Sequence, residues 1–130
     1  MHALLLAAAA AILVLHGLIH LMGTTVYMRL GNVQGLSYKT TLLGGRWDLR
    51  ESGIRIFGLL WVLPAAGFVL AAIALWSGWP AWQALLVSVT VFSLVLTVLD
   101  WSSAYAGVVV NVAILGAAFL APRLVSWLGR

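Results

Sequence analysis

Two histidines stand four residues apart in the segment HGLIHLMG (residues 16–23), inside a stretch that is otherwise almost wholly apolar. On a helix, His16 and His20 share one face, about 40° apart around the axis and about 6 Å apart along it. Such a pair can bind one metal ion, or exchange hydrogen bonds with a ligand. Ionisable side chains inside a membrane are costly, so this pair is a candidate functional site.

Further polar residues occur in the other apolar segments. Residues 90–100 carry a stripe spaced 3, 4 and 3, which occupies a helix face about 80° wide; its members are Thr90, Ser93, Thr97 and Asp100. An unpaired amide or imidazole in hydrocarbon costs about 2–7 kcal/mol, so these groups should turn inward and bond to one another. We therefore predict one ligand-binding site, built from His16, His20, Thr97, Asp100 and Asn111, with Arg55 near its mouth.

The pairing within this site depends on where the first helix leaves the membrane. If it leaves at Tyr27, counting about 1.5 Å per residue places His20 at the level of Asn111. If it leaves one turn earlier, His16 lies at that level, and His20 comes within about 5 Å of the level of Asp100. In the second case a contact between His20 and Asp100 would orient the imidazole. Both alternatives place the site in the half of the bilayer nearer the long loop.

A metal ion or haem is a further alternative for the histidines. His16, His20 and Asp100 could supply three ligands, although HGLIH lacks the glutamate of the zinc-protease pattern H-E-x-x-H. Two histidines on one face of one helix cannot take opposite axial positions on a haem. The remaining histidine, His2, lies at the far end of the same segment. A bis-histidine haem would therefore need a second subunit.

Composition indicates the class of protein that carries these groups. Of 130 residues, 64% are hydrophobic and only 8% are charged, whereas soluble domains carry about 25% charged residues. There is no cysteine, which excludes disulfides and thiolate metal sites. Four segments are long enough to cross the bilayer, at about residues 3–27, 54–76, 81–100 and 104–121. We predict an all-α, integral membrane, four-helix up-and-down bundle that forms a single domain over residues 1–130.

The connections and the charges predict how the chain is threaded. The loop over residues 29–53 is long and polar, and it carries Arg29, Lys39, Arg46 and Arg50. Because cytoplasmic loops are enriched in Lys and Arg, we expect this loop in the cytoplasm of a prokaryotic cell and both termini outside. The same concentration of charge in one loop argues against nucleic acid as a partner. No Lys or Arg precedes the first apolar run, so we expect a retained span rather than a signal peptide.

Local patterns give further expectations about the ends of the helices. DLRE (48–51) resembles a capping box with Asp48 as N-cap, and Glu51 would pair with Arg55 one turn later. Pro122 should end the last helix. Short turns are expected at residues 77–80 and 101–103. Tryptophans should mark the two membrane interfaces, with only Trp61 lying deeper: Trp76, Trp79, Trp82 and Trp127 at one, and Trp47 and Trp101 at the other.

Three segments together resemble a family of uncharacterised, small prokaryotic four-span membrane proteins. They are HGLIHLMG, RIFGLLW (55–61) and WSSAYAGVVVNVAIL (101–115), which are similar to the family patterns HG-x-IHL-x-G, R-x-x-G-L-L-W and W-S-D-A-K-F-G-x-x-x-N. The resemblance covers nearly all of the spans and implies the same fold. It implies no activity. The matching positions are His16, Gly17, His20, Arg55, Trp101, Gly107 and Asn111.

Two positions depart from the family pattern. Ser103 replaces the acid that follows W-S, and Tyr105 replaces the lysine. Asp100, one residue before the tryptophan, is a candidate to take over the role of the missing acid.

Several classes of function fit these features. We favour a membrane protein that binds a small amphiphile, a quinone or a metal ion at the polar site. The main alternative is a transporter or proton-conducting subunit, in which Thr90, Ser93 and Thr97 line a polar route to Asp100. Another is a structural accessory subunit of a homo-oligomer or larger membrane complex, which would present a stripe of small residues, such as Gly107, Ala113 and Ala117. A membrane enzyme is least supported, because no nucleophile stands in a signature turn.

Overall fold

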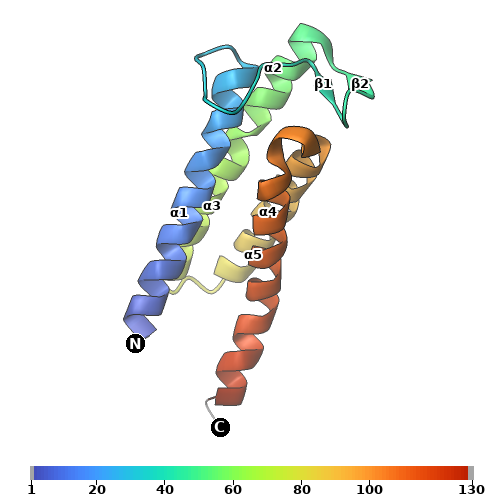
Figure 1. Cartoon of the computed structure of the whole chain (residues 1–130). Coiled ribbons are helices and arrows are strands. Elements are labelled where there is room, and N and C mark those ends of the chain that lie inside the picture. Colours follow the sequence, from blue (N-terminus) through green and yellow to red (C-terminus); the bar gives the residue numbers. More distant parts are fainter. Residues whose placement is uncertain (1, 129–130) are drawn as a thin grey trace.

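The protein is an all-α integral membrane bundle in which four helical units are long and apolar enough to cross a bilayer (Figure 1). The computed structural model describes residues 2–128, and side chains only as far as residue 123. The first three spans are α1 (His2–Tyr27), α2 with α3 (Arg50–Leu60 and Val62–Trp76) and α4 (Trp82–Leu99). The fourth is α5 (Trp101–Leu128). The predicted fold class is therefore confirmed.

The helices form two pairs that face each other. Figure 1 shows α1 beside α3 and α4 beside α5, with α1 beginning and α5 ending at the same end of the bundle. Contacts are extensive between α1 and α3, α3 and α4, and α4 and α5, whereas α1 and α5 touch only slightly. The bundle is therefore tightly packed on three sides and loosely packed on the fourth.

The helical hydrogen bonding of the second span is interrupted at Trp61. Pro64 has no backbone N–H, so it cannot donate to the carbonyl of Leu60 four residues earlier. As a result, α2 ends at Leu60 and α3 begins at Val62. As predicted for residues 54–76, the two helices together form one span, Arg50–Trp76, and Trp61 keeps helical backbone angles (φ −67°, ψ −18°). Trp61 is buried in this span.

The last span continues through its proline, so the prediction that Pro122 ends it is wrong. α5 runs to Leu128. The carbonyl that Pro122 leaves without an intrahelical donor is that of Ala118, and the side-chain amide of Gln83 on α4 donates to it at 2.8 Å. A neighbouring helix thus satisfies the freed backbone group, as apolar surroundings require.

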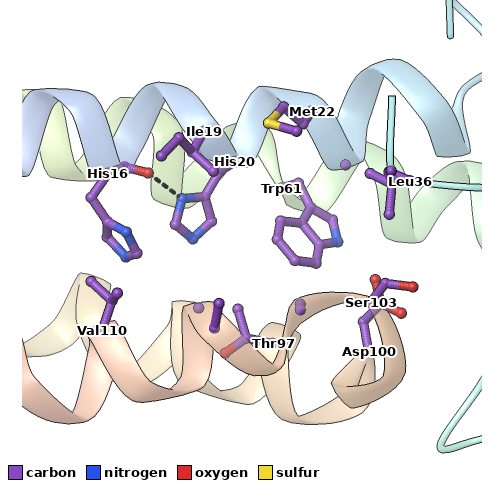
Figure 2. Close-up of a pocket in the computed structure, with 15 residues that line it drawn as sticks. His16, Ile19, His20, Met22, Leu36, Trp61, Thr97, Asp100, Ser103 and Val110 are labelled. Carbon is purple, nitrogen blue, oxygen red and sulfur yellow. Dashed lines mark hydrogen bonds between the residues drawn. The ribbon is translucent and has the colours of Figure 1, made fainter. Parts of the chain in front are cut away.

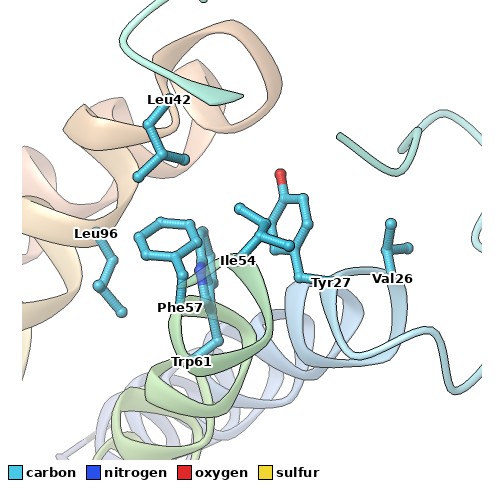
Figure 3. Close-up of a cluster of buried hydrophobic side chains, with 7 residues drawn as sticks. All are labelled: Val26, Tyr27, Leu42, Ile54, Phe57, Trp61 and Leu96. Carbon is cyan, nitrogen blue, oxygen red and sulfur yellow. The ribbon is translucent and has the colours of Figure 1, made fainter. Parts of the chain in front are cut away.

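The loop between α1 and α2 contains a short β-hairpin. β1 (Thr41–Leu42) pairs antiparallel with β2 (Trp47–Asp48). The hairpin is anchored on the bundle, because the Leu43 N–H donates to the carbonyl of Leu99 at 2.9 Å. Leu42 joins a buried cluster at this end of the bundle (Figure 3), whose other members are Val26, Tyr27, Ile54, Phe57, Trp61 and Leu96.

The predicted capping box does not form. Arg50 has a left-handed φ of 60°, and the N-cap of α2 is Leu49, which makes no side-chain cap. Asp48 Oδ1 instead accepts the Arg50 N–H at 2.9 Å. This bond to the charged form, followed by one from the Thr40 side chain, holds the pKa of the Asp48 carboxyl below its ordinary value. Glu51 pairs with Arg29 at 3.2 Å rather than with Arg55.

The turn between the last two spans lies where it was predicted. The backbone of Ala104 departs from helical angles (φ −123°, ψ 20°), so residues 101–103 form one turn between α4 and the long part of α5. In this turn the N–H groups of Ser103 and Ala104 both donate to the Asp100 carbonyl, at 2.9 and 2.8 Å. The side chains of Asp100, Ser102 and Ser103 therefore gather at the loop end of the bundle.

Tryptophans mark the ends of the bundle. Trp76 and Trp79 are exposed at the end where α1 begins and α5 ends, and Trp47 and Trp101 are exposed at the loop end. Trp61 is only 6% exposed. The side chain of Trp127 lies outside the described residues.

A glycine sets the distance between α1 and α3. A Cβ atom on Gly17 would lie 2.9 Å from both the carbonyl oxygen of Ala65 and the Cβ of Phe68. Contacts that close cannot be relieved without moving the α3 backbone. Gly17 therefore allows the approach that holds the two histidines against the bundle interior.

We predict that Gly17→Ala lowers the free energy of unfolding by about 1–3 kcal/mol, because it overpacks the contact between α1 and α3. The measurement is SDS titration in mixed micelles, followed by circular dichroism. Gly116→Ala on α5 is the matched control, since a Cβ there has no neighbour within 4 Å; it should leave stability unchanged or raise it by up to about 1 kcal/mol, because alanine is the better helix former. Equal effects of the two substitutions would contradict this account of the packing.

Candidate functional site

A cavity of about 260 Å³ lies on the loosely packed side of the bundle, between α1 and α5 (Figure 2). One wall is the face of α1 that carries His16, His20 and Gly23, and the opposite wall is residues 103–110 of α5. Trp61 and Thr97 lie between these walls, and Leu36 of the loop and Asp100 lie at the loop end. The cavity thus contains several of the polar residues that the sequence singled out.

The rim of the cavity faces the surroundings of the bundle. Ile19 and Met22 on α1 are 58% and 38% exposed, and Val110 on α5 is 38% exposed. Ala106, which also lines the cavity, is exposed as well. All four side chains are apolar and lie within the spans, where acyl chains would surround them, so this part of the rim faces lipid. Two further lining residues, Gly35 and Ser103, are exposed at the loop end.

His20 is held in one tautomer by two hydrogen bonds. Its Nδ1 lies 2.8 Å from the backbone carbonyl of His16. A carbonyl oxygen only accepts, so Nδ1 carries the proton. In the neutral ring Nε2 is then an acceptor, and the Ser93 hydroxyl donates to it at 2.6 Å.

Asn111 extends this chain of hydrogen bonds to the second histidine. Its Nδ2 donates to Ser93 Oγ at 2.8 Å, and its Oδ1 accepts from His16 Nε2 at 3.0 Å. The bonds therefore run in one direction, from the His16 ring through Asn111 and Ser93 to the His20 ring and back to the His16 carbonyl. We call these four residues the histidine network.

The histidine network joins three helices. His16 and His20 come from α1, Ser93 from α4 and Asn111 from α5. Ser93 and Asn111 have no exposed surface. His16 bonds to Asn111, which is the pairing expected if α1 leaves the membrane one turn before Tyr27. His20 bonds to Ser93. Ser93 belongs to the predicted polar stripe but was not among the predicted site residues.

Asp100 does not join the histidine network, so the suggested contact between His20 and Asp100 is wrong. The Tyr27 hydroxyl donates to Asp100 Oδ2, and Lys39 Nζ lies 2.6 Å from Asp100 Oδ1. Tyr27 stands seven residues beyond His20, which is about 10 Å along the helix. The carboxylate therefore meets the end of α1 rather than its histidines.

Lys39 reaches this carboxylate from the loop. Besides Asp100, it donates to Ser102 Oγ at 2.8 Å and to Ser103 Oγ at 2.7 Å. The Asp100 carboxylate is only 2% exposed, whereas the Lys39 side chain is 24% exposed, so the carboxylate depends on Lys39 for its charge partner. The ion pair ties the loop to the junction of α4 and α5, at the end of the cavity where Asp100 lines it.

The predicted set of metal ligands is not assembled. Within the part of the chain that the structure describes, no group of three His, Cys, Asp or Glu residues could hold a metal ion. His16 and His20 bond within their own network, and Asp100 bonds to Lys39 and Tyr27. The physical reason is the separation of Asp100 from the histidines along the bundle axis.

The remaining predicted residues lie in different surroundings. Thr97 lines the cavity; its hydroxyl donates to the Ser93 carbonyl at 2.9 Å and accepts from Asn111 Nδ2 at 3.3 Å. Thr90 donates to the Leu86 carbonyl at 2.6 Å and does not line the cavity. Arg55 is exposed and lies outside the cavity.

Trp61 is a cavity residue that the sequence analysis missed. Its indole Nε1 is buried and has no hydrogen-bond partner in the described structure. The ring lies 5.5 Å from the His20 ring, centroid to centroid, and packs edge-on against Phe57 at 5.9 Å. Its position in the sequence could have identified it as a site residue, because it is the one tryptophan that lies away from the ends of the predicted spans.

Comparison with known proteins gives no match at any level: no family model, no curated protein and no solved structure matches the chain. The function therefore has to be inferred from the cavity and from the chemistry of the side chains around it.

We predict that Ser93→Ala destabilises the protein by about 1–3 kcal/mol, because His20 Nε2 and Asn111 Nδ2 lose a buried partner. Ser88→Ala is the matched control on α4. The Ser88 hydroxyl is exposed and bonds only to the Ala84 carbonyl of its own helix, so its loss should cost less than about 0.5 kcal/mol. SDS titration measures both. A loss for Ser93→Ala no larger than for Ser88→Ala would show that the histidine network adds little to stability.

We predict that Lys39→Met destabilises the protein by about 3–5 kcal/mol, because it leaves the Asp100 carboxylate buried without a counter-charge. Adding Asp100→Asn should recover most of this loss, since no buried charge then remains. Glu51→Gln serves as the control, because it removes only an exposed ion pair and should cost at most about 1 kcal/mol. Thermal unfolding in detergent compares the four proteins; a double variant as unstable as Lys39→Met alone would refute the assignment.

Proposed function

We propose that the protein is a membrane-embedded binding protein for a small neutral amphiphile. The head group occupies the cavity between α1 and α5, and the tail stays in the bilayer. The single observation that supports this most is the composition of the cavity. It has a polar, aromatic interior at His20 and Trp61 and an apolar rim at Ile19, Met22 and Val110.

The size of the cavity suits a head group. Pockets that enclose drug-sized ligands measure about 300–1,000 Å³, and this cavity measures about 260 Å³. A whole lipid would not fit, but a ring or an ester group would, with its tail leaving through the lateral opening.

The charges around the cavity favour a neutral ligand. The ammonium of Lys39 balances the Asp100 carboxylate, and the two imidazoles bond within the histidine network. A metal ion would need ligands that the described residues do not assemble. Of the ligand classes considered, a quinone or another uncharged amphiphile therefore fits better than a metal ion.

The same proposal includes the orientation in the membrane. The cations of the long loop favour its placement in the cytoplasm of a prokaryotic cell, with both termini outside. The cavity lies toward the loop end, where Leu36 and Asp100 line it. The ligand would then enter from the cytoplasmic leaflet.

Photoaffinity labelling tests this function. The native protein in lipid nanodiscs is labelled with a diazirine-bearing fatty ester, and the crosslinks are mapped by mass spectrometry. We expect saturable labelling of residues 16–23 and 103–110, which an excess of unmodified ester prevents. Labelling spread evenly over the lipid-facing surface, or labelling that does not saturate, would refute the proposal.

Two phenylalanine substitutions on α5 sharpen this test. Ala106→Phe places a ring at the cavity from an exposed position and should abolish most of the saturable labelling. Ala117→Phe adds the same ring on the same helix, away from the cavity, and should label as the native protein does. Equal labelling of the two variants would contradict binding in the cavity.

A further inference from the structure

Trp61 carries a buried hydrogen-bond donor without an acceptor. The residue is 6% exposed, and its Nε1–H has no partner in the described structure. A buried polar group without a partner costs about 1–3 kcal/mol, and water cannot replace the partner in hydrocarbon. Every donor of the histidine network next to it has a partner. The indole N–H is therefore the group that a ligand would satisfy.

The indole is also positioned to meet a ligand. Trp61 lines the cavity, and Figure 2 shows its ring in the space between α1 and the α4–α5 pair, with the nitrogen on the side of Leu36 and Asp100. A Cβ on Gly23 would lie 2.8 Å from the ring, so α1 packs closely against one side of the indole. Phe57 packs edge-on against it. These contacts hold the donor in one orientation before any ligand binds.

We infer that the Nε1–H of Trp61 binds the carbonyl oxygen of a neutral, lipid-soluble head group, with the rings of His20 and Trp61 beside it. The inference rests on the proposed function and adds the chemistry of recognition. A carbonyl fits because it accepts a hydrogen bond and has no hydrogen to donate. The carbonyl can belong to a quinone ring or to a fatty-acyl ester, and the experiment separates these two sources.

Proton–nitrogen correlation NMR of the indole N–H groups tests the donor directly. The protein is labelled with ¹⁵N at its tryptophans and placed in nanodiscs, and Trp61→Phe identifies the Trp61 peak by its loss. Decylubiquinone, a monoacylglycerol and decane are added in separate titrations. We expect the Trp61 N–H proton to move downfield with a carbonyl probe and to stay in place with decane, which has no acceptor. The probe that moves the peak names the source of the carbonyl.

Affinity gives an independent readout. We expect Trp61→Phe, which keeps an aromatic ring but removes the donor, to raise the dissociation constant of the active probe about tenfold. Trp101→Phe, at an exposed tryptophan at the start of α5, should leave it unchanged. Circular dichroism checks that both variants fold. If Trp61→Phe does not fold, the NMR titration of the native protein still tests whether the Trp61 N–H binds a carbonyl.

The outcomes separate this inference from the function on which it rests. If neither carbonyl probe moves the Trp61 peak, or if Trp61→Phe binds as tightly as the native protein, the donor role is refuted. If Ala106→Phe abolishes binding while Trp61→Phe does not, the cavity proposal stands and only the role of Trp61 falls. If neither variant changes binding, both fall.

Discussion

A polar group buried among membrane helices must find its partner inside the protein, and this requirement shapes most of the structure. It explains why imidazole, hydroxyl and amide groups from α1, α4 and α5 form one directed chain of hydrogen bonds. It also explains why Lys39 folds back from the loop onto Asp100. Without these contacts, α1 would have little to hold it toward the α4–α5 pair, because it packs mainly on α3.

The two prolines of the spans show the same requirement with opposite results. At Pro122 a glutamine on the neighbouring helix supplies the missing donor to Ala118, and α5 continues. At Pro64 the hydrogen bonding is interrupted between α2 and α3, although the two helices form one span. A rule based on proline alone does not include the glutamine of a neighbouring helix that donates to the Ala118 carbonyl. For this reason, the last helix was predicted to end too early.

Hydrophobic length was enough to predict the four spans, because crossing a bilayer needs about 20 apolar residues whatever their partners. Helical spacing was enough to place the two histidines and Asn111 on inward faces, where the structure joins them. The partners of Asp100 were not predictable in this way. Lys39 lies in a loop without periodicity, and Tyr27 faces Asp100 only because of the depth at which α1 ends. Spacing determines which residues share a face, but relative depth depends on packing between helices.

The unpaired indole N–H of Trp61 indicates a ligand site because the other buried polar groups are paired. In a structure with many unpaired buried groups, one more would not indicate a ligand. Here the described residues pair nearly every buried side-chain donor and acceptor, and Asp100 Oδ1 is paired with the ammonium of Lys39. The residue that carries the remaining donor, Trp61, lines a cavity whose rim faces lipid. The requirement that assembles the bundle therefore also indicates where its ligand should bind, since an acceptor carried in from the membrane would complete the last pairing.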